Sequence, residues 1–256
     1  MDSETLRVTI CGRLDVACGD TLVGEESLPA RQGRRLWAYL VLNRRRPVGR
    51  DELAEALWGD DIPDAWDTSL NAIVSRLRAV LRPVAVCAKG LALRGVVGRY
   101  QLEMPAEALV DRERAWDAIH HVRAFRRAGD VRGAWAEAVI ATEIAARGFL
   151  AGEEAPWIEA ERRILRDIEL QALEAVADAE VAQGRAVEAQ HVARRLVTTD
   201  PLREAGYRLL MRAHQLAGNG AAAAEVLEEC RTALSRVGAT PSSETERVYR
   251  EVTGAR

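Results

Sequence analysis

The stretch Asp64–Arg82, DAWDTSLNAIVSRLRAVLR, decides how the rest of the sequence is interpreted. Its apolar residues recur at helical spacing, at Leu70, Ile73, Val74, Leu77 and Leu81. This periodicity predicts one helix with a single buried stripe. The remaining face carries hydroxyl, amide and guanidinium groups separated by small residues, and no acidic residue follows Asp67 within the helix.

Such a face suits insertion into the major groove of DNA, where Asn and Arg contact base edges while Ser, Thr and Arg hold phosphates. An ordinary amphipathic helix with a solvated basic face shows the same pattern, so the flanking chain must decide between the two. The candidate DNA contacts on this helix are Thr68, Asn71, Ser75, Arg76, Arg78 and Arg82. Asn71 is the preferred base contact, because its amide suits adenine.

The elements around this helix predict a winged helix-turn-helix. A small sheet is expected from Leu6–Ala17, Thr21–Val23 and Glu26–Leu28, and two helices from Gln32–Leu42 and Arg50–Trp58. After the central helix, short β-forming pieces at Val84–Cys87 and Leu91–Leu93 and a strand at Tyr100–Met104 predict a hairpin. Three helices followed by a hairpin form a winged helix, and a leading sheet resembles the OmpR-type variant. In this arrangement, two helices support the third while the hairpin lies over the adjacent groove or backbone.

A basic run precedes the central helix. Between Arg31 and Arg50 the sequence holds seven arginines and no acidic residue. Arg44, Arg45, Arg46 and Arg50 are candidates for contact with the DNA backbone. As in related winged helices, the turn before the second helix and the loop Gly59–Pro63 could instead contact RNA polymerase, or the arginines could simply keep the surface soluble.

From about residue 106 the chain is almost wholly helical and rich in alanine. The expected helices are Leu109–Ala128, Val131–Ala146, Ala155–Gln183, Ala186–Thr199, Leu202–Ala217, Ala221–Val237 and Ser243–Val252. Gly184 and Gly218 lie 34 residues apart, which is the period of a tetratricopeptide helix pair. Stacked helix pairs usually bind partners, so this half is predicted to be an interaction domain. Glu153 and Glu154 are expected on a solvated face. The predicted fold is mainly α with small β, divided into residues 1–105 and 106–256.

Composition limits the classes of function. The net charge of −3 excludes a nucleic-acid-binding polycation, although residues 1–105 carry a small positive excess. The four cysteines are far apart and show no metal-ligand spacing, which predicts free thiols and no metal site. The sequence shows no signal peptide and no apolar run long enough to span a membrane. We therefore expect a cytoplasmic, nucleoid-associated protein with no membrane contact, no enzymatic motif and no cofactor.

Four phrases resemble the SARP-type bacterial transcriptional activators, named for Streptomyces antibiotic regulatory proteins. Ser69–Leu81, SLNAIVSRLRAVL, is similar to the family's recognition-helix phrase ALQTYVSRLRKAL, and Gly98–Glu103, GRYQLE, resembles its G-G-Y-R-L. Phe149–Glu174 and Asp200–Leu234 resemble the opening and the later repeats of the bacterial transcriptional activation domain. The likeness covers residues 6–252.

The resemblance implies sequence-specific binding to double-stranded DNA, commonly at direct repeats near a promoter. It also implies recruitment of RNA polymerase holoenzyme, often for specialised-metabolite genes such as those of antibiotic biosynthesis. Two copies bound to direct repeats would form a head-to-tail homodimer on DNA.

The sequence departs from the family pattern at three points. Asn71-Ala72-Ile73 replaces the family's Q-T-Y, which changes the expected operator, and Arg99 replaces a hairpin glycine. Arg99 either adds a cation aimed at the minor groove or lies on a surface turn. No G-x-x-x-x-G-K-[ST] motif occurs, so nothing implies ATP.

An alternative from another class stays open. The protein would then be a helical-repeat adaptor or small-molecule sensor whose winged helix binds protein, or binds DNA only with a ligand. An adaptor does not need arginines on the Asn71–Arg82 face, and its DNA affinity would not fall steeply with salt.

Overall fold

A computed structural model describes residues 5–254. The chain forms two compact units, and each is assembled from two separate stretches of sequence. The first unit comprises Met1–Arg114 and Arg147–Ile164, and the second comprises Ala115–Ala146 and Leu165–Arg256. The mainly helical fold with small sheets agrees with the prediction. The units do not follow a single division after residue 105, because a later segment returns to the first unit.

The first unit begins with a four-stranded sheet of order β3-β2-β1-β7. Its strands are β1 (Arg7–Thr9), β2 (Asp15–Cys18), β3 (Thr21–Val23) and β7 (Leu109–Val110). Two details differ from the prediction. Glu25–Ser27 forms a 3-10 helix, η1, in place of a strand, and Leu109–Val110 pairs in parallel with β1 before the next helix begins.

Three helices follow, as predicted: α1 (Ala30–Leu42), α2 (Arg50–Trp58) and α3 (Trp66–Cys87). The expected stripe of α3 is buried at Leu70, Val74, Leu77 and Leu81. The strand predicted at Val84–Cys87 is wrong, because α3 continues through Pro83 to Cys87. Val84 extends the buried stripe by one turn, and this packing outweighs the backbone hydrogen bond that Pro83 cannot make.

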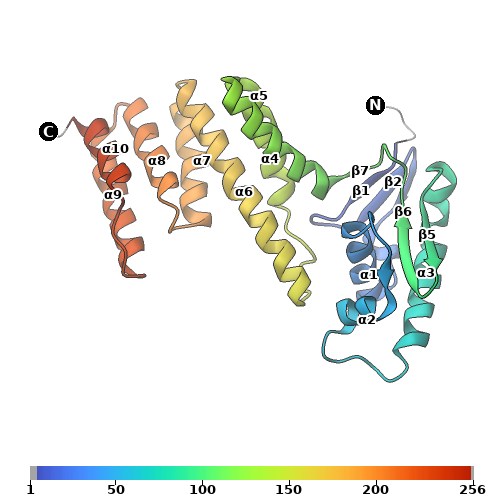
Figure 1. The fold of residues 1–256 in the computed structure, drawn as a ribbon. Coiled ribbons are helices and arrows are strands. Elements are labelled where there is room, and N and C mark those ends of the chain that lie inside the picture. The colour runs from blue at the N-terminus through green and yellow to red at the C-terminus, as the bar shows by residue number, and fades with distance from the viewer. Residues whose placement is uncertain (1–4, 255–256) are drawn as a thin grey trace. The chain divides into compact units, whose positions relative to one another are not determined.

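The hairpin consists of β5 (Ala92–Val96) and β6 (Arg99–Glu103), and β4 (Val48–Gly49) completes the sheet in the order β4-β6-β5. In Figure 1 the hairpin lies beside α3. Val96 pairs with Arg99, which leaves a two-residue turn. Both turn residues have positive φ, as this turn requires, and Gly98 adopts φ +71° without steric cost. We call this hairpin the wing.

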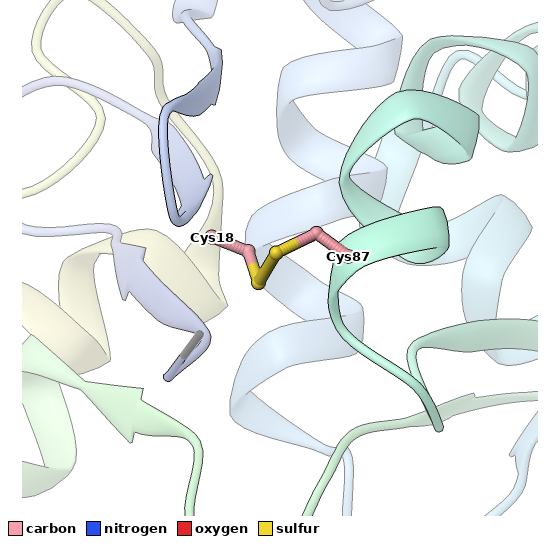
Figure 2. The surroundings of a disulfide bond; sticks show 2 residues. All are labelled: Cys18 and Cys87. Carbon is pink, nitrogen blue, oxygen red and sulfur yellow. A yellow bond between two sulfur atoms is a disulfide. The ribbon is translucent and has the colours of Figure 1, made fainter. Parts of the chain in front are cut away.

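A disulfide joins Cys18, the last residue of β2, to Cys87, the last residue of α3 (Figure 2). Their Cα atoms are 5.9 Å apart, although the two cysteines are 69 positions apart in sequence. The prediction of free thiols is therefore wrong for this pair. It is confirmed for Cys11 and Cys230, which are free and buried. The bond ties the C-terminal end of α3 to the sheet.

The remaining helices are α4 (Asp111–Ala128), α5 (Val131–Ala145), α6 (Pro156–Ala182), α7 (Ala186–Thr199), α8 (Glu204–Leu216), α9 (Gly220–Ser235) and α10 (Ser243–Thr253). In the second unit, α7 to α10 pack around a core that includes Leu196, Tyr207 and Leu227. Gly206 allows α8 to approach α7 closely, because an added Cβ would lie 3.1 Å from Val197. Between residues 5 and 254, no helix is long and apolar enough to cross a bilayer.

Candidate nucleic-acid interface

The outer face of α3 carries the predicted contact residues. Thr68, Asn71, Ser75, Arg76, Arg78 and Arg82 are all exposed, while the apolar stripe holds the opposite side of the helix in the core. Ala72 and Ala79 are exposed between them. The face is therefore polar and open, and it presents small side chains where a DNA backbone would approach.

Three arginines of α3 and the wing are free of protein partners. Arg76, Arg82 and Arg99 are exposed, and none of their side chains makes an ion pair or hydrogen bond in the described part of the chain. The hydroxyl groups of Thr68 and Ser75 also lack partners within that range. These cations and hydroxyls remain available for an external anion.

Arg78 differs from its neighbours because it fastens α3 to the wing. Its Nε donates to the carbonyl oxygen of Leu93 at 2.9 Å, and its guanidinium carbon lies 5.8 Å from the centre of the Tyr100 ring. The residue remains exposed, so its terminal amino groups can still face DNA. Arg78 thus has a structural task in addition to any DNA contact.

Asn71 is held by two residues from outside α3. Its Oδ1 accepts from Nη1 and Nη2 of Arg50, both at 3.1 Å, and from the Tyr100 hydroxyl at 3.0 Å. Arg50 Nη1 also donates to the Tyr100 hydroxyl at 2.8 Å, and the guanidinium pairs with Asp67. The sequence analysis did not identify Tyr100 as part of the site, although it lies within the GRYQLE phrase.

The other predicted arginines of the basic run have acidic partners within the protein. Arg44 donates to both carboxylate oxygens of Glu113, at 2.8 and 2.7 Å. Arg45 approaches Glu113 at 3.7 Å, but 83% of its side chain is exposed. Arg46 pairs with Glu52, and this pairing lowers the pKa of Glu52 to about 2. Of these three arginines, Arg45 retains the most accessible charge.

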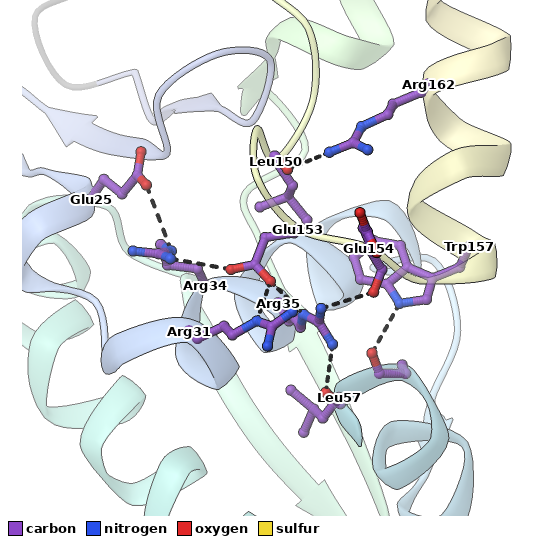
Figure 3. A network of polar contacts seen from close by, with 11 residues as sticks. Glu25, Arg31, Arg34, Arg35, Leu57, Leu150, Glu153, Glu154, Trp157 and Arg162 are labelled. Atoms are coloured by element: carbon purple, nitrogen blue, oxygen red, sulfur yellow. Dashed lines mark hydrogen bonds and ion pairs between the residues drawn. The ribbon is translucent and has the colours of Figure 1, made fainter. Parts of the chain in front are cut away.

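The start of the basic run surrounds a buried carboxylate (Figure 3). Glu153 is 3% exposed, and it accepts from Arg31 at 2.6 Å, from Arg34 at 3.1 Å and from Arg35 at 2.9 Å. Burial alone would raise the pKa of Glu153, but hydrogen bonds from the three arginines hold it below its ordinary value. The prediction that Glu153 is solvated is wrong, because three cations compensate its desolvation.

The same segment makes further contacts within the first unit. Arg35 Nη1 donates to the carbonyl of Leu57 and Nη2 to the carbonyl of Glu154, both at 2.9 Å. The indole of Trp157 donates to the carbonyl of Ala56 at 3.0 Å. Residues 147–164 therefore brace α1 and α2, the two helices that support α3. No group of three or more metal-ligating side chains occurs among residues 5–254.

Comparison with protein families agrees with this architecture. The family "Transcriptional regulatory protein, C terminal" matches residues 24–92, which include the three helices of the first unit. The family "Bacterial transcriptional activator domain" matches residues 110–253. Both families consist of transcription regulators.

Individual relatives show the same combination. The Regulatory protein AfsR of Streptomyces coelicolor is 32% identical over 206 residues, which cover 80% of this chain and 20% of that protein. AfsR of Streptomyces griseus is 27% identical over 257 residues, covering 99% of this chain and 25% of the relative. The chain thus spans a fifth to a quarter of the length of these relatives.

A solved structure has the same fold. The structure of Mycobacterium tuberculosis EmbR in complex with a low-affinity phosphopeptide matches with a TM-score of 0.83 and 25% identity. The match covers 98% of this chain and 65% of EmbR.

An OmpR-type winged helix joined to a helical activator domain defines a class of bacterial transcription regulator. The chain belongs to the SARP-type family of these regulators.

Proposed function

We propose that the protein is a sequence-specific transcriptional activator that places α3 in the major groove and the wing against the neighbouring backbone or minor groove. The observation that carries this proposal is the outer face of α3, which holds no acidic residue after Asp67 and leaves the side chains of Arg76, Arg82 and Arg99 unpaired within the described chain. Exposed arginines without carboxylate partners are well suited to bind phosphates and guanine.

The finer aspects of this function rest on the family. The protein acts in the cytoplasm at the nucleoid and recruits RNA polymerase to promoters with direct repeats, where two copies bind head to tail. Genes of specialised metabolism are the expected targets. The exposed Arg45 and the turn between α2 and α3 (residues 59–65) are candidates for contact with DNA or polymerase.

One observation favours a ligand-dependent version of this function. A surface cavity of about 380 Å³ in the second unit is lined by residues that include Val197, Tyr207 and Arg236. A small molecule bound there would make the helical half a sensor, as in the adaptor or sensor alternative.

A salt titration tests the proposal. Wild-type protein is titrated with its own upstream promoter duplex and with a scrambled duplex, and the same is done for the double variant Arg76→Ala/Arg82→Ala. We expect tight, salt-steep and selective binding by the wild type, with the slope of log affinity against log salt reduced by about 2 in the variant.

A matched control is Arg127→Ala/Arg132→Ala, which removes two exposed and unpaired arginines from the second unit. This control should bind like the wild type. Equal losses in both double variants would contradict the assignment of α3, and absence of selective binding by the wild type would favour the sensor or adaptor.

A further inference from the structure

The amide of Asn71 has a fixed orientation in the protein. A guanidinium carries only hydrogen-bond donors, so the Asn71 atom that faces Arg50 must be the oxygen. The Tyr100 hydroxyl accepts from Arg50 and therefore directs its own hydrogen to the same oxygen. Three hydrogen bonds thus occupy Oδ1.

The amino group of the same amide remains available. Asn71 is exposed, and Nδ2 has no hydrogen-bond partner in the described part of the chain. The amide consequently offers two N–H donors to a ligand and no free acceptor. Asparagine contacts adenine in the major groove with both atoms, because Oδ1 accepts from N6 while Nδ2 donates to N7.

We propose that Arg50 and Tyr100 fix Asn71 as a donor-only contact, so that it selects guanine or thymine edges over adenine. Guanine presents N7 and O6 as acceptors and thymine presents O4, whereas adenine adds an amino group that the occupied Oδ1 cannot accept. This inference rests on the proposed docking of α3 in the major groove. It changes the base expected at this position from the sequence-based expectation of adenine.

Arg50 and Tyr100 act as positioning residues in this arrangement. Tyr100 is 7% exposed, and the centre of its ring lies 5.5 Å from the guanidinium carbon of Arg50. The tyrosine therefore supports Asn71 from inside the protein. Arg50 is held in turn by Asp67, to which its Nε donates at 3.0 Å. Removing both supports should free the amide to rotate.

The test compares base preferences by selecting bound sequences from a duplex library randomised across the operator. The variants of the full chain are Asn71→Ala and Arg50→Met/Tyr100→Phe. For the wild type we expect preference for guanine or thymine over adenine at one position, by a factor on the order of ten. Asn71→Ala should abolish that preference, and Arg50→Met/Tyr100→Phe should shift it toward adenine.

The readout is the relative preference among the four bases at one position. A relative measure is needed because loss of Arg50 also lowers the overall affinity for DNA. Where guanine is the selected base, a second readout is its replacement by 7-deazaguanine, which should weaken binding by the wild type but not by Asn71→Ala. Two results would overturn this inference alone. In the first, the wild type binds selectively but prefers adenine, and Asn71→Ala removes that preference. In the second, Asn71→Ala leaves the base preferences of the wild type unchanged. A wild-type protein without selective binding would overturn the proposed function and this inference with it.

Discussion

Two groups of arginines in the first unit have opposite environments. Each of the seven arginines of the basic run from Arg31 to Arg50 lies within ion-pair distance of a carboxylate. Arg76, Arg82 and Arg99 have no such partner in the part of the chain that the structure describes. Apart from the exposed Arg45, the first group directs its charge to partners within the fold, and the second group leaves its charge on the surface.

The difference shows that a cluster of cations in a sequence does not locate a binding surface. The carboxylates that neutralise the basic run come from other parts of the chain; Glu153, for example, lies 118 residues after Arg35. The α3 face holds fewer arginines, but beyond Asp67 it carries no acidic residue, and no carboxylate pairs with Arg76 or Arg82 in the described part of the chain.

The largest effect is expected from Glu153→Ala, which leaves Arg35 buried without its carboxylate. Breaking a buried ion pair in this way should lower the free energy of unfolding by about 3–5 kcal/mol. Urea denaturation followed by tryptophan fluorescence measures the loss. Glu154→Ala removes the same charge from an exposed neighbour and should change the free energy of unfolding little. Similar losses of stability in both variants would show that the buried ion pairs of Glu153 contribute no more than an exposed carboxylate does.

A somewhat smaller effect is expected from reduction of the Cys18–Cys87 disulfide. Because the exposed side of α3 lacks internal ion pairs over most of its length, the helix depends on other anchors, and this bond holds its last residue. Opening it should cost about 2–4 kcal/mol, as loss of a constraint on a long loop generally does. Urea midpoints with and without a phosphine reductant test this, and Cys18→Ala should be insensitive to the reductant. Unchanged wild-type stability would contradict the prediction.

A comparison of Arg82→Ala with Arg44→Ala contrasts the two groups directly. Arg82→Ala should leave stability unchanged and lower the salt slope of DNA binding by about 1. Arg44→Ala should leave the salt slope unchanged and weaken the fold, because Glu113 is left without its main partner. Fluorescence anisotropy measures DNA binding by both variants, and urea denaturation measures their stability. A lower salt slope for Arg44→Ala together with a lower stability for Arg82→Ala would contradict the prediction.

The smallest effect concerns pH. The pKa of Glu52 is lowered from 4.5 to about 2, chiefly by hydrogen bonding to Arg46. A carboxyl whose folded pKa is depressed stabilises the protein above its unfolded pKa and loses that contribution as pH falls through the folded pKa. The contribution of Glu52 to stability should therefore stay level from pH 7 to about 5 and decline toward pH 2. Glu52→Gln should show a shallower decline in urea midpoints, and an identical decline would exclude Glu52 as a contributor.

Much of the fold follows from local patterns in the sequence. The buried stripe of α3, the limits of α2 and α7, and the wing strands depend on periodicity and turn residues that lie close together. The extension of α3 past Pro83 does not, because packing of Val84 outweighs a local helix-breaking signal. The disulfide and the Glu153 cluster join residues that are distant in sequence, and no local pattern marks them.

The candidate site shows the same limit. Exposure of the α3 side chains follows from helical periodicity, since they occupy the face opposite the apolar stripe. The orientation of the Asn71 amide depends on Arg50 and Tyr100, which lie 21 and 29 residues away. Periodicity places a side chain on a face, but the atom it presents is determined by neighbours from other elements.

The return of residues 147–164 to the first unit has a consequence for protein synthesis. Arg31, Arg34 and Arg35 leave the ribosome more than a hundred residues before Glu153, their shared counter-ion. Until that segment emerges, the nascent first unit carries unneutralised arginines and incompletely supported helices. We therefore expect the DNA-binding unit to mature only after the ribosome has passed the beginning of α6, so that products of early termination do not compete for operators.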